Sequence, residues 1–234
     1  MKIPVIKGLI ERRILINYRV EPERLINVLP QPFKPKLVDG FGIAGICLIR
    51  LQQIRPKGIP AFAGISSENA AHRIAVEWDE NGVVREGVYI PRRDTNSIFN
   101  HLTGGRVFPG KHFLSDFRVK EKDSTYEIDI IHKGTSYISV KAKESSCLNP
   151  DSIFKNIDNA SEFFQSGSIG FSPNKKGIDG LTLKTQQWKV EPLSVERVQS
   201  AFFEDNKAFP QGSVTFDNAL IMHNISHEWC NYEV

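Results

Sequence analysis

Apolar residues recur mostly at every second position along this chain, in short runs that Gly, Pro, Asn and Asp interrupt. A period of two is typical of β-strands, because successive side chains point to opposite faces. The stretch 42–51 is almost wholly apolar and indicates a strand buried on both faces. The pattern predicts about ten strands, at residues 12–20, 42–51, 65–78, 83–90, 112–120, 125–133, 135–143, 181–190, 192–204 and 213–224.

Two short turns link neighbouring strands of this pattern. Asn81-Gly82 separates two predicted strands and is typical of a hairpin turn, because both of its positions need positive φ. Lys133-Gly134 marks a second turn, within a predicted meander of antiparallel strands.

Short helices are also expected. The first begins at Pro22, after Glu21, and ends before Pro30. A capping Asp and a terminating Gly predict two more, at residues 94–102 and 151–165. In the second helix we expect three apolar side chains to face inward: Ile98, Phe99 and Leu102.

A chain with so many strands and only isolated helices must close its sheet or pack two sheets together. The predicted fold class is therefore mainly β, a closed or curved antiparallel barrel or cone with two or three short helices. We find no internal repeat and no long linker, so residues 1–234 are expected to form a single domain.

Composition narrows the function classes. Hydrophobic residues make up 40% and charged residues 24% of the 234 positions, as in an ordinary globular protein. The net charge of +3 is small and dispersed, so we expect no nucleic acid partner. No apolar run approaches the roughly 18 residues that span a bilayer, and residues 1–15 lack a signal-peptide core. These features predict a cytoplasmic protein without a membrane partner.

The cysteines and histidines suggest no metal site. Cys47, Cys147 and Cys230 are too few and too widely spaced for a disulfide framework or a zinc ligand set. His223, His227 and Cys230 have a helix-like ligand spacing, but the preceding residues indicate a strand. We expect neither a metal nor a cofactor, since phosphate-loop and dinucleotide fingerprints are also missing.

Two polar groupings leave alternatives open. Period two places Glu68 and His72 on one strand face and Arg73 on the other. The first pair could line a pocket, or stand in an exposed cross-strand ladder. Arg92-Arg93-Asp94 precedes a predicted helix start, which favours either an anion site or a solvated loop.

Residues 13–32 resemble the opening of acetoacetate decarboxylase and its relatives, where a strand carrying an arginine runs into a helix and then a Pro-x-Pro. The segments 188–193, 200–203, 209–210 and 227–229 look more like an uncharacterised branch of the same superfamily. The resemblance covers nearly the whole chain. It implies a closed β-cone around an interior pocket.

The resemblance also implies site residues. Family members form a Schiff base through the first lysine of an aromatic-Pro-Lys-Lys run, whose amine must be neutral near pH 7. The matching run here is Phe108-Pro109-Gly110-Lys111, so Gly110 occupies the nucleophile position. Lys111 could serve if the loop shifts by one residue, with Arg106 and His112 beside it; otherwise it is a turn lysine.

Other positions match the family more closely. Glu68 lies where the family has a pocket glutamate, acting as general acid/base or as a counter-ion. Arg12 or Arg13 lies within one residue of the carboxylate-binding arginine, whose fork donates two parallel hydrogen bonds. The candidate catalytic residues are therefore Glu68 and Lys111. The candidate substrate-binding residues are Arg12, Arg13, His72, Arg73, Arg92, Arg106 and His112.

Two functions are compatible with this sequence. The first is a pocket protein that binds a small carboxylate or carbonyl compound, with lyase activity on a keto acid as the reaction to test. The second is a non-catalytic ligand-binding or assembly module that has lost the Schiff-base lysine. The superfamily also makes a homo-oligomer an option.

Overall fold

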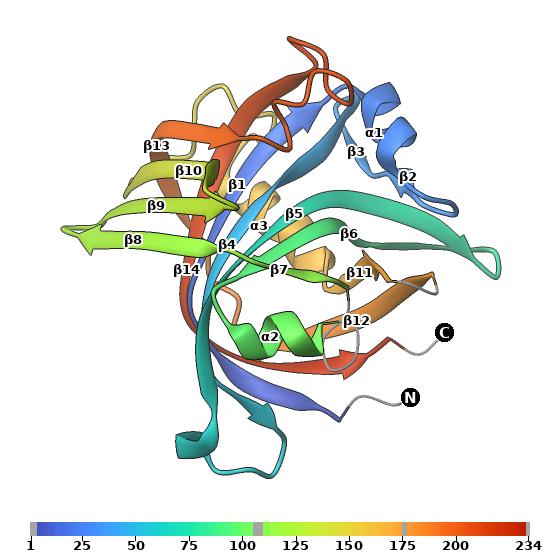
Figure 1. The fold of residues 1–234 in the computed structure, drawn as a ribbon. Coiled ribbons are helices and arrows are strands. Elements are labelled where there is room, and N and C mark those ends of the chain that lie inside the picture. Colours follow the sequence, from blue (N-terminus) through green and yellow to red (C-terminus); the bar gives the residue numbers. More distant parts are fainter. Residues whose placement is uncertain (1–3, 105–109, 175–176, 233–234) are drawn as a thin grey trace.

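Strands dominate the architecture, as the alternating pattern predicts (Figure 1). The structure is a computed structural model that describes residues 4–104, 110–174 and 177–232. The helices are α1 (Pro22–Val28), the 3-10 turn η1 (Ala61–Ala63), α2 (Ile98–Thr103) and α3 (Ile157–Ser166). The strands are β1 (Ile6–Val20), β2 (Lys34–Pro35), β3 (Leu37–Val38), β4 (Phe41–Pro56), β5 (Ile65–Glu80), β6 (Val83–Thr95), β7 (His112–Leu114), β8 (Asp116–Lys122), β9 (Thr125–His132), β10 (Thr135–Glu144), β11 (Ile169–Pro173), β12 (Ile178–Thr185), β13 (Glu191–Ser200) and β14 (Val214–Asn231).

These strands form one strongly curved sheet that returns on itself. Hydrogen bonding runs in the order β1-β4-β5-β6-β11-β12-β14, and β14 pairs with β1. Neighbouring pairs are antiparallel except for a short parallel contact between β6 and β11. The predicted closed or curved β fold is confirmed, with a ring of seven strands enclosing an interior.

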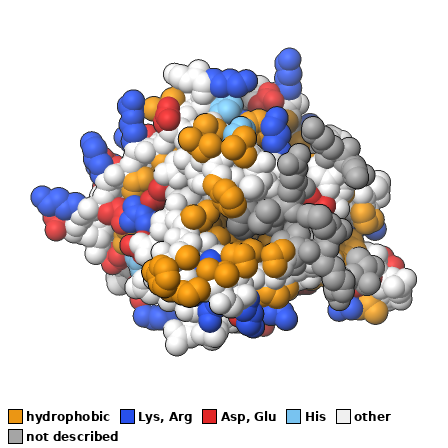
Figure 2. All heavy atoms as spheres, turned by 60° about the horizontal axis from the view of Figure 1, so that its bottom comes forward, with side chains coloured by type: hydrophobic (Ala, Val, Ile, Leu, Met, Phe, Trp, Pro, Cys, Tyr) orange, Lys and Arg blue, Asp and Glu red, His pale blue; other side chains and the backbone are white. Residues whose placement is uncertain are grey.

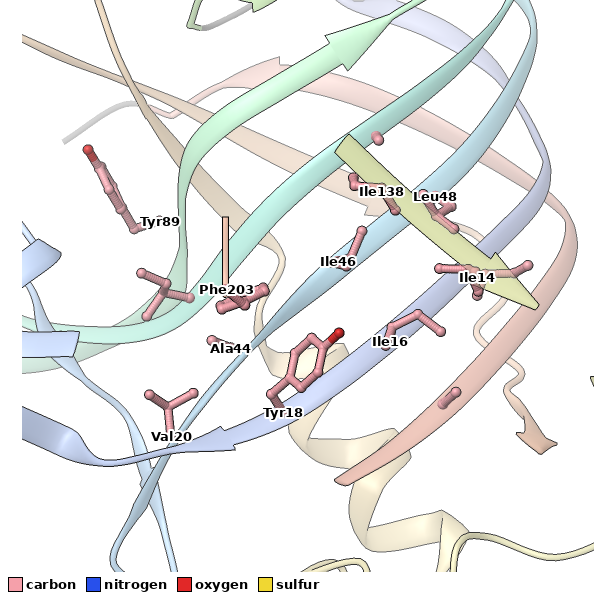
Figure 3. Packing of buried hydrophobic residues seen from close by; sticks show 14 of the residues in the cluster. Ile14, Ile16, Tyr18, Val20, Ala44, Ile46, Leu48, Tyr89, Ile138 and Phe203 are labelled. Atoms are coloured by element: carbon pink, nitrogen blue, oxygen red, sulfur yellow. The ribbon is translucent and has the colours of Figure 1, made fainter. Parts of the chain in front are cut away.

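A second part of the sheet leaves the ring as an arm. The N-terminal half of β14 pairs with β13, and the order continues through β10 and β9 to β8. This arm curls over the outer face of β1 and β4, where Ile138 of β10 lies across from Ile14 and Leu48 (Figure 3). The outer core therefore fills the space between ring and arm.

Alternation along the ring strands divides the apolar residues between two cores. In β1, Ile14 and Ile16 belong to the outer core, whereas Leu15 belongs to a separate inner core beneath α3. In β4, Ile46 and Cys47 divide in the same way. β1 and β4 are thus buried on both faces, which explains the nearly unbroken apolar run at 42–51.

Both predicted turns are present. Asn81 and Gly82 join β5 to β6 with φ values of 56° and 81°. Lys133 and Gly134 join β9 to β10 with φ values of 51° and 79°. Only residues that tolerate the left-handed region fit such tight turns easily, so local sequence sets these two hairpins.

The helix expected at residues 94–102 differs from the prediction. Asp94 does not cap it but lies buried in β6, and Ser97 caps α2 by accepting a hydrogen bond from the Asn100 backbone. Only Asn100 of this helix is buried. The three apolar side chains expected to face inward are exposed: Ile98, Phe99 and Leu102. Figure 2, which brings the bottom of Figure 1 forward, shows hydrophobic side chains gathered on that face.

The third helix begins later than expected. Instead of starting at Asp151, α3 starts after Asn156, whose side chain caps it. The buried carboxylate of Asp217 accepts hydrogen bonds from the Ser152 hydroxyl at 2.7 Å and the Ile153 backbone N–H at 2.9 Å. These bonds hold the preceding segment in an irregular turn. The expected end at Gly167 is confirmed.

Candidate functional site

The ring of strands encloses a cavity of about 130 Å³. Every ring strand contributes to its wall, together with Asn100 of α2 and His112 of β7. Most of the wall is apolar: Ile10, Ile49, Leu51, Ile54, Val88, Ile90, Leu181, Leu183 and Trp229. An interior that is mostly apolar with a few convergent polar groups is typical of a small-molecule site.

Three arginines line this cavity: Arg13, Arg73 and Arg93. Strand periodicity explains two of them. Leu15, Cys47, Ala71 and Arg93 are successive cross-strand partners on the inner face. Arg13 lies two residues from Leu15, and therefore shares its face.

Arg13 contacts the thiol of Cys47. Its Nε donates to Sγ at 3.3 Å, and its guanidinium lies 5.8 Å from the centre of the Trp188 ring. Cys47 itself is buried and stands on the cavity wall. The charge of Arg13 is thus held at the wall by an aromatic face and a sulfur atom.

Arg73 is almost fully buried beneath α3. Its guanidinium lies 4.8 Å from the centre of the Phe164 ring, and Nη2 donates to Oδ1 of Asn17. Its Nε is buried and has no hydrogen-bond partner in the described part of the chain. Burial lowers the pKa of Arg73 to about 10, and the nearby charge of Arg13 acts in the same direction.

Arg93 lies on the neighbouring strand β6, as the cross-strand partner of Ala71. Its Nε donates to Oγ of Ser172 at 3.1 Å, and burial lowers its pKa to about 10. His112 lies nearby, and burial followed by the charge of Arg93 lowers the His112 pKa to about 3. His112 is therefore neutral at physiological pH, while both arginines keep their charge.

Negative charge on the cavity wall is scarce. Asp94 is the acidic residue among the described lining residues, and it is already engaged. Arg92 donates to both of its oxygens, at 2.9 Å and 2.8 Å, and the Ser115 hydroxyl donates at 2.8 Å. Within residues 4–104, 110–174 and 177–232, no carboxylate forms an ion pair with Arg13, Arg73 or Arg93.

The opposite face of the same strands carries a paired network. Arg12 is buried and donates to Glu68 at 2.6 Å and to Glu121 of β8. Arg50 pairs with the same two carboxylates, at 2.5 Å and 2.9 Å. Arg12, Arg50 and Glu68 are cross-strand partners of one row, so β1, β4 and β5 together with the arm hold the cluster.

His72 and Arg92 also lie on this outer face. The imidazole of His72 is fully buried, 3.0 Å from Oγ of Ser200 and 4.7 Å from the ring of Phe202. Burial lowers its pKa to about 3, helped by the charge of Arg92. Arg92 stacks 3.7 Å from the ring centre of Tyr137. Glu68 and His72 share a face, as predicted, but that face does not line the cavity.

Lys111 is exposed and does not line the cavity. Its Nζ lies 4.6 Å from the centre of the Phe113 ring. Gly110 has a φ of 77°, and a Cβ there would stand 2.5 Å from the Cβ of Ser172. The position that aligns with the family nucleophile therefore has no room for a side chain in this conformation. Arg106 lies outside the described residues.

Of the predicted site residues, the structure brings Arg13, Arg73 and His112 to one cavity. It separates them from Arg12, Glu68, His72 and Arg92, which occupy the outer face. Arg93 and Asn100 were missed as pocket residues, because residues 92–94 were interpreted as a loop before a helix. Alternation from Val88 and Ile90 would place Arg92 rather than Arg93 on the inner face; a register irregularity between β5 and β6, at His72/Ile74, brings Arg93 beside Ala71 instead.

The histidine and cysteine grouping near the C-terminus lies wholly on β14, which continues past the predicted strand end at residue 224 to Asn231. His227 shares the face of Trp229, and Cys230 points to the other side. Throughout the described residues there is no group of three His, Cys, Asp or Glu side chains placed to hold a metal ion. None of the described helices has the length and apolarity needed to cross a membrane.

Comparison with solved structures places this fold. Acetoacetate decarboxylase from Legionella pneumophila subsp. pneumophila str. Philadelphia 1 superposes with a TM-score of 0.63 at 13% identity, covering 98% of this chain and 86% of that chain. The enduracididine biosynthesis enzyme MppR, complexed with pyruvate, gives 0.64 at 10% identity, covering 100% and 90%. An acetoacetate decarboxylase-like enzyme from Sphingomonas wittichii RW1 gives 0.60 at 12%, covering 99% and 92%.

At these identities the solved structures establish the fold alone. No curated protein matches the chain significantly. A family model does match it, over residues 10–220, and that family, DUF2071, is described as an uncharacterized conserved protein. The predicted resemblance is confirmed for the fold and for an uncharacterised family: the chain belongs to the DUF2071 family and has the fold of acetoacetate decarboxylase.

Proposed function

We propose that this protein binds a small organic carboxylate in its interior cavity, and that guanidinium groups rather than a lysine imine hold it. The observation that carries this proposal is the convergence of Arg13, Arg73 and Arg93 on one cavity without a carboxylate partner among the described residues. Guanidinium forks match carboxylate geometry and donate two parallel hydrogen bonds.

The cavity wall supports the same ligand class. Apolar side chains surround the arginines, so a carboxylate with a short carbon skeleton would bury its apolar part while its charge is neutralised. In a site that excludes water, charge-assisted hydrogen bonds are stronger than at the surface. The relative MppR, whose structure contains pyruvate, is an example of a small keto acid bound within this fold.

Imine chemistry has little support. A Schiff base requires an amine on the cavity wall, and the lining residues that the structure describes include no lysine. Arginine cannot replace it, because a guanidinium does not lose its proton near neutral pH. The crowded position of Gly110 against Ser172 leaves no space for the family lysine. These features favour the hypothesis of a ligand-binding protein that has lost the Schiff-base lysine.

The test is to incubate the protein with pyruvate and with acetoacetate, add borohydride, and measure both binding and covalent adducts. We expect saturable binding by calorimetry and no adduct by mass spectrometry. Arg13→Gln should weaken binding about tenfold or more, since a hydrogen bond to a charged group contributes about 1.5–3 kcal/mol. Lys111→Ala, the matched control, should bind as tightly as the unmodified protein.

Two results would contradict the proposal. A stoichiometric adduct on Lys111 would restore the decarboxylase-type reaction. If neither pyruvate nor acetoacetate binds, and malate, succinate, 3-hydroxybutyrate and butyrate do not bind either, the proposal that the cavity binds a carboxylate is wrong.

A further inference from the structure

The three inner-face arginines carry more positive charge than one monocarboxylate can neutralise. Cys47 lies among them: Arg13 donates to its Sγ at 3.3 Å, and its thiol interacts electrostatically with both Arg73 and Arg93. The charge of Arg13 also acts on Arg73 directly. A single carboxylate satisfies one guanidinium fork and neutralises one charge.

Most donor groups of these arginines remain available for a ligand. Each guanidinium has five N–H donors. Between described residues, the hydrogen bonds of these side chains use Nε of Arg13, Nη2 of Arg73 and Nε of Arg93. Nε of Arg73 is buried without a partner in the described part of the chain. A buried donor without an acceptor is unfavourable, so an anion with several oxygens fits this wall.

A further unsatisfied group has the opposite polarity. Asn100 is buried, and its side-chain nitrogen lies 3.2 Å from Oγ of Ser67 and 3.4 Å from Oγ1 of Thr95. Its Oδ1 is buried without a partner among the described residues, and Asn100 lines the cavity. An acceptor in that position fits a hydroxyl group of the ligand.

The cavity limits the size of the ligand. Its volume of about 130 Å³ is smaller than the roughly 300–1,000 Å³ of pockets for drug-sized molecules or cofactors. It corresponds to about four water molecules at their share of liquid volume. Such a space suits an acid with a short carbon chain.

From these observations we propose that the ligand is a small hydroxy-dicarboxylate: its two carboxylates bind the arginines around Cys47, and its hydroxyl donates to Oδ1 of Asn100. This inference rests on the proposed carboxylate-binding function. It adds a second negative charge and a hydrogen-bond donor to the ligand, so it can fail while the proposed function stands.

Four acids of similar size separate these elements: malate (hydroxyl and two carboxylates), succinate (two carboxylates), 3-hydroxybutyrate (hydroxyl and one carboxylate) and butyrate. Calorimetric titrations at pH 7.5, where every carboxyl group is ionised, should show succinate binding at least tenfold more tightly than butyrate. Malate should bind more tightly than succinate. The affinity for succinate should fall more steeply with added salt than the affinity for butyrate, because two charges are screened.

Variants assign the two interactions. Arg93→Gln should weaken succinate binding about tenfold or more and bring its affinity close to that of butyrate. Asn100→Ala should remove the preference for malate over succinate while succinate binding is kept. Lys111→Ala, with an exposed cation outside the cavity, is the control for a general loss of positive charge. Circular dichroism and unfolding curves confirm that each variant is folded.

The outcomes distinguish the two proposals. Equal affinity for succinate and butyrate would overturn the dianion inference and leave carboxylate binding intact. Equal affinity for malate and succinate, or a malate preference that survives in Asn100→Ala, would overturn the role of the hydroxyl. Failure of all four acids, of pyruvate and of acetoacetate would overturn both proposals.

Discussion

The two faces of the ring strands carry the same residue types in opposite electrostatic states. On the outer face, Arg12 pairs with Glu68 and Glu121, and Arg92 pairs with Asp94. Arg13 follows Arg12 in the sequence, and Arg93 follows Arg92, but both lie on the inner face. There they have no carboxylate partner among the described residues. Neighbours in the sequence are thus separated by the thickness of a strand.

This difference distinguishes cations that stabilise the fold from cations that can bind a ligand. A paired guanidinium has its charge neutralised within the protein, and contributes to the attachment of the arm. An unpaired guanidinium in an apolar cavity is unfavourable for folding, because burial penalises its charge. Natural proteins bury unpaired charges mainly at functional sites. A bound anion would offset the free-energy cost of burying these guanidinium groups.

The largest effect is expected from acidic pH, which should lower the free energy of unfolding because histidines are buried on both faces. His72 on the outer face and His112 and His227 on the inner face have pKa values lowered from 6.5 to about 3, about 3 and about 4, mainly by burial. Below pH 6.5 the unfolded chain binds protons that the folded chain does not, so stability decreases as pH falls toward 4. Three such groups together lower the free energy of unfolding by up to about 4 kcal/mol for each pH unit.

Urea unfolding between pH 7.5 and 4.5 measures this dependence. A free energy of unfolding that stays constant down to pH 4.5 would contradict the burial of these imidazoles. His112→Asn should reduce the slope by about one third.

Replacing Arg12 and Arg13 one at a time should show most directly that the outer face contributes stability and the inner face binds the ligand. Arg12→Met should destabilise the protein by about 3 kcal/mol, the lower end of the range for breaking a buried ion pair, because Arg50 still neutralises Glu68 and Glu121. Arg13→Met should leave stability within about 1 kcal/mol and weaken anion binding. Denaturant unfolding and succinate titration measure both quantities. The reverse result, with Arg13 controlling stability, would invert the comparison.

Gly110 tests whether the inner wall excludes a lysine. Gly110→Ala combines a positive φ of 77° with a Cβ 2.5 Å from Ser172 Cβ, whereas Gly82→Ala has a similar φ of 81° in open space. We expect Gly82→Ala to cost about 1 kcal/mol and Gly110→Ala about 2 kcal/mol more. Thermal and denaturant unfolding of the two variants provides the measurement. Equal destabilisation would mean that a side chain at position 110 fits after all.

The smallest effect is expected for ligand affinity across neutral pH. Arg73 and Arg93 have pKa values of about 10, so both stay charged from pH 6.5 to 9. His112 stays neutral in that range, since its pKa is about 3. The affinity for succinate should therefore change less than about twofold, and weaken as pH rises through 10. A steep change between pH 6 and 7 would implicate a titrating histidine in binding.

Local sequence predicts the strands and hairpins well and the helices less well. Asn81-Gly82 and Lys133-Gly134 specify their turns through the residue types that tolerate positive φ. The predicted start of the second helix is wrong because Asp is a preferred helix-capping residue, and Asp94 stands only three residues before the true cap, Ser97. Arg92 and Ser115, the actual partners of Asp94, make it a buried strand residue, and only the folded chain brings Ser115 to it.

Alternation by itself determined that Arg12 and Arg13, or His72 and Arg73, lie on opposite faces, because a strand turns each successive side chain over. It did not determine which face surrounds the cavity. That choice depends on the pairing of β14 with β1 and of β6 with β11, between segments far apart in the sequence, and on the arm that covers the outer side. In β1 and β4 both faces carry buried apolar residues, so the hydrophobic pattern of these strands does not distinguish the cavity face from the outer face. Ring closure and the covering arm together decided which arginines meet carboxylates and which line the cavity.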